Sequence, residues 1–309
     1  MSDSGSAPRF GNAGSFRRAL RLDYNQKMPR RPLSLFILGS LAVAAAFAQQ
    51  SQAPRGRTLL LPRTIVSGER ATLAVLDGNG RLTAGATVVF SNGDRLRTDK
   101  TGRALFVAPL DPGVIYGSLA GRASRVSTTI LSRSENLKST MDVTAIPKIS
   151  SLTDRFEITG HGFCGGADAN QITISGAPAF ILASSPTALI VMPPADLAPG
   201  RASVDISCAK QNGPPLEVVF VALDLEADTS PLQPGVHREL TVHVRGTRDR
   251  VSLEARNLAP DVAELVGGNP RRVATSGGWD NLAHYAIIGR SRGSFRIAIR
   301  LLDAAPRSD

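Results

Sequence analysis

The sequence predicts an all-β protein, built as a tandem array of small β-sandwich domains behind an N-terminal signal helix. Short runs rich in Val, Leu, Ile and Thr recur along the chain, and turn residues separate them. Gly and Pro are frequent, at 29 and 20 of 309 residues, and sustained helical periodicity is scarce. The apolar fraction of 42% suffices for packed cores, which excludes a disordered secreted tail.

The first element is a secretory signal peptide at residues 28–48. Met28 opens a short basic segment, MPRRP, and residues 33–48 are apolar or small throughout, ending on AFA. Charge, apolar core and small-residue exit come in the order typical of a signal peptide. The apolar run has 16 residues, fewer than the roughly 20 of a spanning helix, which favours cleavage over a retained N-terminal anchor. Both alternatives place the rest of the chain outside the cytoplasm, because the basic flank stays inside.

Residues 1–27 are mostly polar, and we set them aside from the fold as a disordered or mis-started extension, with Met28 as the start. Cleavage after Ala48 leaves 261 residues, which fits two or three domains. No Cys follows the apolar run, so the sequence indicates no lipid anchor. We expect an extracytoplasmic protein, periplasmic, surface-bound or secreted, with no stable membrane span in its mature form.

The net charge of +10 raises the question of nucleic-acid binding, which two observations argue against. Residues 1–31 hold seven basic and two acidic residues, so the mature part carries only half of the excess. The arginines are also scattered and are not interleaved with aromatic residues, as base stacking requires. Weak attraction to anionic surface polymers is the better interpretation.

The only two cysteines, Cys164 and Cys208, both lie in the exported part. An even count in an oxidising compartment predicts one disulfide. A Cys164 nucleophile beside His161 is the alternative, and the partner cysteine argues against it, because a reactive thiol must be free and its pKa lowered.

The first sandwich is expected at residues 58–131. Its predicted strands are short and separated by turns, at 58–61, 71–76, 87–90, 103–108 and 127–131. The stretch DGNGRLTAGATVVFSNG, followed by RTDKTGRALF, resembles bacterial immunoglobulin-like domains of the invasin and carboxypeptidase-regulatory types. Residues 132–143 are polar and are predicted to be a linker.

Residues 144–224 contain three sequence motifs in succession, FEITGHGF at 156–163, QITISGAPA at 171–179 and SPTALIVMPP at 185–194. The stretch resembles an IPT/TIG domain, which implies an immunoglobulin-like fold. Two glycines in the first piece allow a sharp turn that inserts Phe163 into the core, and the prolines of the last piece end a strand. The chain departs from the family where SSLTD, at 150–154, replaces a glycine-rich turn. The predicted disulfide would staple the end of the second strand to a late strand.

Residues 225–303 are expected to form a third sandwich of general immunoglobulin-like character, with strands at 237–244, 250–253, 284–288 and 294–301. Leu240, Val242 and Val244 share one face of the first strand, and the last strand alternates apolar with polar or small residues. That pattern is typical of a half-buried antiparallel strand.

Several patterns resemble catalytic or metal sites, and each has a simpler structural explanation. The four histidines lack the i, i+2 and i, i+4 spacings of a metal site. The DGNG turn at 77–80 lacks the further acidic ligands of a calcium loop. GRSRG at 289–293 matches a nucleophile elbow, but a strand follows it and no His lies beyond residue 284, so a hairpin turn is favoured. We therefore expect no catalytic residue, no metal, no cofactor and no enzyme.

The segment TSGGWDNL at 275–282 holds the only Trp of the chain. Exposed on a loop, Trp279 with Asp280 and Asn281 would be a candidate ligand contact, because an aromatic ring flanked by polar groups stacks on a sugar. A Trp packed between the sheets is the alternative that the sequence favours, since buried aromatic residues dominate core energetics.

The predicted function is that of a non-enzymatic cell-envelope or secreted scaffold or adhesion protein. Its partner would be a surface protein or a polysaccharide, bound through loops at a sandwich end or through sheet edges, and not nucleic acid. A carbohydrate-binding accessory protein is the alternative, and exposure of Trp279 would favour it.

Overall fold

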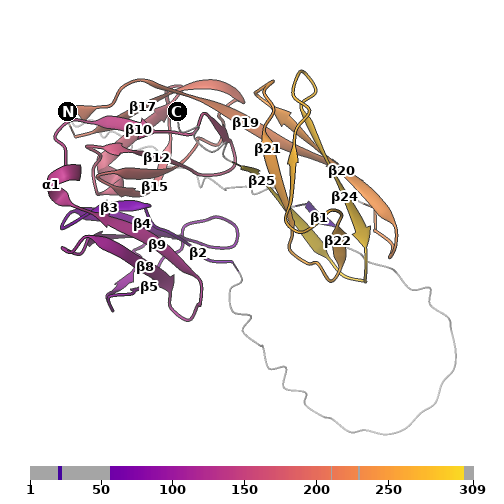
Figure 1. Cartoon of the computed structure of the whole chain (residues 1–309), viewed down its shortest axis with the longest axis horizontal. Helices are drawn as coiled ribbons and strands as arrows, with labels where there is room; N and C mark the ends of the chain where they lie inside the picture. The colour runs from indigo at the N-terminus through magenta and orange to yellow at the C-terminus, as the bar shows by residue number, and fades with distance from the viewer. Residues whose placement is uncertain (1–19, 23–55, 210, 229, 303–309) are drawn as a thin grey trace, which may run out of the picture.

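The computed structural model describes residues 20–22, 56–209, 211–228 and 230–302, and it confirms the predicted fold class. Strands dominate, and they form sandwiches with three main hydrophobic cores (Figure 1). Of the signal peptide predicted at 28–48, every residue lies outside the described part. Within the residues that the structure describes, no helix combines the length and apolar character of a membrane crossing.

The first sandwich packs three strands of one sheet against five of another. The three are β2 (Thr58–Leu60), β4 (Arg70–Leu76) and β7 (Arg103–Val107). The five are, in order across the sheet, β3 (Thr64–Val66), β9 (Arg125–Leu131), β8 (Gly113–Leu119), β5 (Thr87–Phe90) and β6 (Arg95–Arg97). Leu73, Val75 and Val88 are fully buried between them. All five strands predicted for this region are present, to within two residues at each end.

The second sandwich packs strands β10, β12, β16 and β15 against a sheet of β14, β13, β17 and β19. Their bounds are β10 (Asp142–Ala145), β12 (Phe156–His161), β13 (Asn170–Ile174), β14 (Ala177–Pro178), β15 (Phe180–Ser185), β16 (Ala188–Met192), β17 (Gly200–Cys208) and β19 (Leu216–Ala227). Two short strands complete the second sheet, β11 (Ile149–Ser151), parallel to β19, and β18 (Gln211–Asn212), paired with β17. Phe163 is buried in this core, as predicted.

The third sandwich packs β19, β20, β24 and β22 against β25, β21 and β23. The bounds of the new strands are β20 (His237–Arg245), β21 (Ser252–Asn257), β22 (Ala263–Leu265), β23 (Arg271–Ala274), β24 (Leu282–Gly289) and β25 (Phe295–Leu302). Leu240, Val242 and Val244 are buried on one face of β20, as their alternation predicted. The GRSRG segment connects β24 to β25 and so passes between the two sheets, which corrects the expectation of a hairpin turn.

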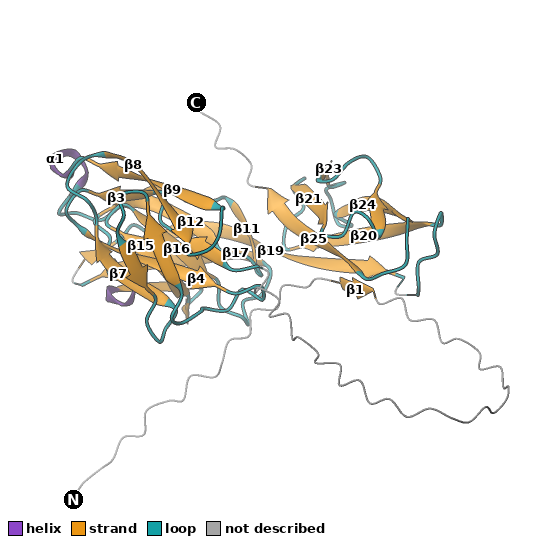
Figure 2. Cartoon of the chain, turned by 90° about the horizontal axis from the view of Figure 1, so that it is seen from below, coloured by secondary structure: helices purple, strands orange, loops and turns teal. Residues whose placement is uncertain are grey.

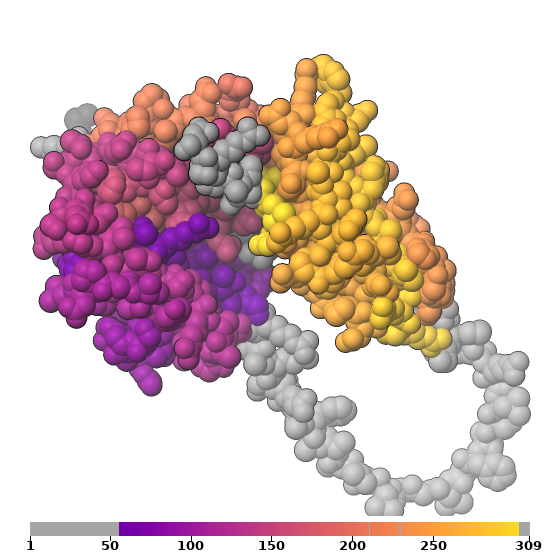
Figure 3. Space-filling view, viewed as in Figure 1, coloured from indigo at the N-terminus to yellow at the C-terminus, as the bar shows by residue number. Residues whose placement is uncertain are grey.

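The first two sandwiches share a sheet. β4 pairs with β15 through Thr72 and Ser184, which makes a seven-stranded sheet. The hydroxyls of both residues donate to the carbonyl of Gly165, at 2.9 and 2.8 Å. A side chain at Gly165 would collide with the backbone of Arg70, so this glycine permits the close approach. Figure 3 shows the two sandwiches as one continuous body.

Arg103 fixes the same junction. Its side chain is largely buried, its Nη2 lies 2.6 Å from Asp168, and its Nη1 donates to the carbonyl of Ile181 at 3.2 Å. The guanidinium also lies over the ring of Phe180, 5.4 Å from its centroid. Residues 132–143, expected as a linker, contain helix α1 (Arg133–Asn136) and the start of β10, and Arg133 forms an ion pair with Glu69 at 3.0 Å.

The second and third sandwiches share a strand. The twelve residues of β19 pair with β17 through their first half and with β20 through their second half. Figures 1 and 2 show β19 passing from the second sandwich into the third. The boundary expected between residues 224 and 225 therefore lies inside a strand that belongs to both sheets.

Residues 20–22, within the extension that we had set aside, form strand β1 (Leu20–Leu22). β1 pairs antiparallel with β25, Leu20 opposite Ile297 and Leu22 opposite Phe295. β25 otherwise has β21 on one side only, and the unpaired backbone groups of such an edge accept an extended segment.

Candidate functional site

Trp279 is exposed, which corrects the favoured expectation that it packs between the sheets. The residue is 84% accessible and lies in the loop from β23 to β24. The guanidinium carbon of Arg248 stands 3.3 Å from the centroid of the indole ring. This contact places a cation on one face of the ring and holds the ring on the surface.

A buried asparagine holds the loop that carries Trp279. The side chain of Asn281 accepts a hydrogen bond from the backbone N–H of Gly277 at 2.9 Å and donates to the carbonyls of Asp249 and Thr247 at 2.8 and 3.3 Å. Of the three predicted contact residues, Trp279 and Asp280 are therefore exposed, whereas Asn281 shapes the loop.

The loop has further internal bonds. The hydroxyl of Ser276 donates to the carbonyl of Asp280 at 2.7 Å and accepts from the N–H of Leu282 at 2.9 Å. Gly277 and Gly278 have φ of 74° and 83°, in the left-handed region that glycine occupies without strain. The ring is thus presented on a preorganised loop, which lowers the entropy cost of binding.

A second loop, residues 246–250 between β20 and β21, completes this end of the third sandwich. Arg250 donates to the carbonyl of Ser276 at 3.2 Å, and Arg248 reaches Trp279. At the other end of this loop, Gly246 lies against the second sandwich. A Cβ there would be 2.8 Å from the backbone nitrogen of Gly200 and still closer to the carbonyl of Phe220. The Trp279 surface, defined as loops 246–250 and 275–281, is therefore anchored at the junction of two sandwiches.

The predicted disulfide is present, with the Cα atoms of Cys164 and Cys208 5.8 Å apart. It joins the segment after β12 to the end of β17, as expected. Asn170, opposite Cys208 in the sheet, accepts from the N–H of Cys164 and donates to its carbonyl, both at 2.8 Å. Because the Cys164 sulfur is bonded, it is no nucleophile, and the structural explanation is confirmed.

The histidines do not converge. His243 lies 2.8 Å from the carboxylate of Glu226, His284 lies 3.2 Å from the hydroxyl of Thr241, and His161 contacts the carbonyl of Asn136. Among the described residues, no three His, Cys, Asp or Glu side chains are grouped as a metal ion would require.

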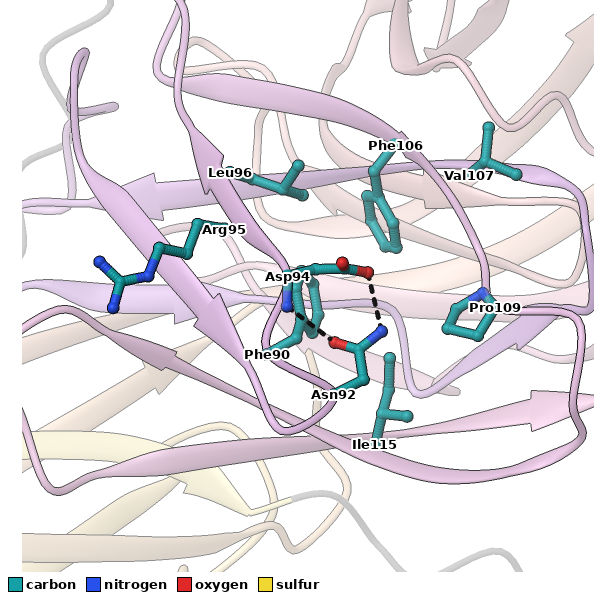
Figure 4. Close-up of a pocket in the computed structure, with 9 residues that line it drawn as sticks. All are labelled: Phe90, Asn92, Asp94, Arg95, Leu96, Phe106, Val107, Pro109 and Ile115. Atoms are coloured by element: carbon teal, nitrogen blue, oxygen red, sulfur yellow. Dashed lines mark hydrogen bonds between the residues drawn. The ribbon is translucent and has the colours of Figure 1, made fainter.

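The first sandwich has a mainly apolar pocket of about 240 Å³ between β6 and β7 (Figure 4). Phe90 and Phe106, with ring centroids 5.3 Å apart, line it together with Leu96 and Ile115. Its titratable lining residues are Asp94, which accepts from the amide of Asn92 at 2.7 Å, and Arg95, which points away from Asp94. The pocket does not place an acid next to a base, and its apolar lining is a part of the hydrophobic core that is open to solvent.

No family model matches the chain, and no curated protein matches it. The assignment of residues 144–224 to the IPT/TIG family therefore stays a prediction.

Solved structures of similar architecture include SGBP-B of the Bacteroides ovatus mixed-linkage glucan utilization locus, in complex with a mixed-linkage heptasaccharide. It is 10% identical, with 81% of this chain and 76% of that chain covered and a TM-score of 0.29. The Escherichia coli adhesin FdeC is 13% identical, with 81% and 94% covered and a TM-score of 0.23. Likeness at these identities and TM-scores carries no functional information.

Proposed function

We propose that this chain is an exported, non-enzymatic envelope or secreted scaffold protein whose Trp279 surface contacts a polysaccharide. The observation that carries the proposal is the exposed indole on a preorganised loop. Arg248 lies over one face of the indole, and an indole face presented on the surface suits the apolar face of a sugar ring. The exposed Trp279 therefore favours a carbohydrate as the ligand. The sandwiches that hold the loop would serve as the scaffold.

The scaffold role is supported by the two shared sheets. β19 and the β4–β15 pairing join the sandwiches through backbone hydrogen bonds, so the Trp279 surface has a defined position relative to the other two domains. A rigid support suits a protein that presents a loop to a ligand, because binding and recognition residues concentrate on loops positioned by a scaffold.

The test is a glycan array probed with residues 49–309, followed by titration of each hit with Trp279→Ala. We expect the variant to lose about tenfold or more in affinity, from one lost stacking contact. Tyr116→Ala is the control, because Tyr116 is an exposed aromatic residue on β8 of the first sandwich, outside the Trp279 surface. The proposal is wrong if the array shows no binding, or if Trp279→Ala binds every glycan hit as tightly as the parent protein does.

A further inference from the structure

The outward face of the β21, β23 and β25 sheet carries four exposed arginines. Strand alternation places them there, since Leu253, Ala255, Phe295 and Ile297 point into the core. The arginine face is defined as Arg256 on β21, Arg272 on β23, and Arg296 and Arg300 on β25.

One carboxylate lies within the face. Glu254 stands opposite Arg272 on one side and Arg300 on the other. Its oxygens lie 3.0 Å from Nε of Arg272 and 2.7 Å from Nη2 of Arg300. A single negative charge thus orients two guanidinium groups across three strands and leaves them with a net positive charge.

The other two arginines have no such partner within the described part of the chain. Among the residues that the structure describes, neither Arg256 nor Arg296 contacts an acidic side chain. Arg256 is opposite Ala298, so Arg296 is its diagonal neighbour, about 7 to 8 Å away at Cα. The face therefore holds four positive charges against one negative charge on three adjacent strands, and along β25 the Cα atoms of Arg296 and Arg300 are about 13 Å apart.

The arginine face leads toward Trp279. Arg250, two residues before β21 begins, donates to Ser276 in the Trp279 loop, and Arg248 lies over the indole ring. Charged and aromatic groups thus follow one another from the sheet to the end of the sandwich.

We propose that the arginine face binds an anionic polysaccharide with carboxylates on its sugar units, which rests on the proposed function and names its ligand class. A polymer with repeated charges engages several arginines at once, and these weak pairs then act together. Most other outward side chains of the three strands are small, such as Ser252, Ala274 and Ala298. The large apolar residues at this face are Leu302, half-buried opposite Ser252, and Leu258, exposed just after β21, and they lie at opposite ends of the face. Two separated leucines make a small apolar area for insertion into a bilayer, and the outward positions of the three strands carry no aromatic ring on which a nucleic-acid base would stack.

The test compares polygalacturonate with neutral dextran as probes of residues 49–309, by affinity electrophoresis at two salt concentrations. We expect retardation by polygalacturonate only, and Arg256→Gln/Arg296→Gln should weaken it about fivefold or more and flatten its salt dependence. Neither arginine has an ion-pair partner among the described residues, so the variant should keep the parent Tm. The control Arg81→Gln/Arg125→Gln removes the same charge from exposed positions of the first sandwich and should bind as the parent protein does.

Equal weakening in both double variants, or none in the first, would overturn the inference. Tighter binding at the same salt to phosphatidylglycerol vesicles or to DNA would assign the face to another partner and would overturn it as well. Trp279→Ala separates the two proposals. If its glycan binding falls while Arg256→Gln/Arg296→Gln binds normally, the proposed function stands and the anionic ligand class fails.

Discussion

Glu254 shows how one side chain can organise a sheet surface. It is 2% exposed on a face that otherwise points to solvent, because two arginine side chains cover it. The hydrogen bond from Arg272 lowers the pKa of the carboxyl below its ordinary value of 4.5, and Arg300 adds to this, although burial opposes it. The carboxylate is thus favoured in the folded protein.

This lowered pKa predicts a pH-dependent stability. The contribution of Glu254 is fully present above its unfolded pKa and is lost as pH falls through its lower folded pKa. Glu254→Gln should therefore lower Tm at pH 7, and the difference from the parent protein should shrink at strongly acid pH, where both side chains are neutral. Thermal unfolding followed by circular dichroism across this range measures it.

Glu264→Gln is the matched control, since Glu264 also pairs with an arginine, Arg290 at 2.5 Å, but is more exposed. Exposed pairs contribute little, so its Tm should stay near that of the parent protein. A Tm difference for Glu254→Gln that is the same at every pH would contradict the role assigned to its charge.

At the scale of elements, the disulfide and Asn170 together fix how β12, β13 and β17 meet. Cys164 is bound through its sulfur to Cys208 and through its backbone to Asn170. The bridge spans 44 positions of sequence, so it removes much freedom from the unfolded chain.

Replacing the bridge by Cys164→Ser/Cys208→Ser should lower the free energy of unfolding by about 4 kcal/mol, the chain-entropy value for a loop of this length. Urea unfolding of residues 49–309 measures the change. A reductant should destabilise the parent protein and leave the double variant unaffected, which serves as the internal control. Equal stability of the two proteins without reductant would show that the bridge contributes nothing.

The pairing of β1 with β25 bears on export. If residues 28–48 direct export, their basic flank and the residues before it stay on the cytoplasmic side, while the third sandwich crosses. β1 and β25 then end in different compartments. In that case residues 20–22 do not pair with β25 in the exported chain, and this edge of β25 lacks the partner strand β1.

At the scale of the whole molecule, backbone pairing replaces flexible linkers. β19 gives one half of its length to the second sandwich and the other half to the third, and β4 of the first sandwich pairs with β15 of the second. The first two sandwiches also share a small apolar cluster, formed by Leu60, Ala74, Leu76, Leu182, Ala183 and Ile190. Domain motion is thus restricted compared with domains joined by a polar linker.

Ala222 tests this continuity, because it lies in β19 opposite Arg245, at a position whose backbone groups face β20. Ala222→Pro removes a backbone N–H from this pairing and should loosen the joint, which small-angle scattering would detect as a larger radius of gyration. Ala222→Ser changes the side chain little and keeps the N–H, so it should scatter as the parent protein does. Identical profiles for the Pro and Ser variants would mean that β19 does not hold the domains together.

Sequence patterns identified the strands with clear alternation or apolar runs, and they missed others. β6 and β23 were missed because arginines fill them and leave one large apolar residue each, and β8 because its apolar residues are interrupted by glycine and serine. Arg272, on the missed strand β23, belongs to the arginine face only because β23 pairs with β21. Local composition does not reveal such a pairing.

The sequence by itself determined the all-β class, the buried face of β20, the burial of Phe163 and the Cys164–Cys208 bridge. These depend on local periodicity, or on two cysteines that have only each other. Tertiary structure alone decided that Trp279 is exposed, because Asn281 takes the buried position beside it. It also decided that the sandwiches share sheets and that four arginines gather on one face. Pairing between strands far apart in sequence sets these features, and no local pattern encodes it.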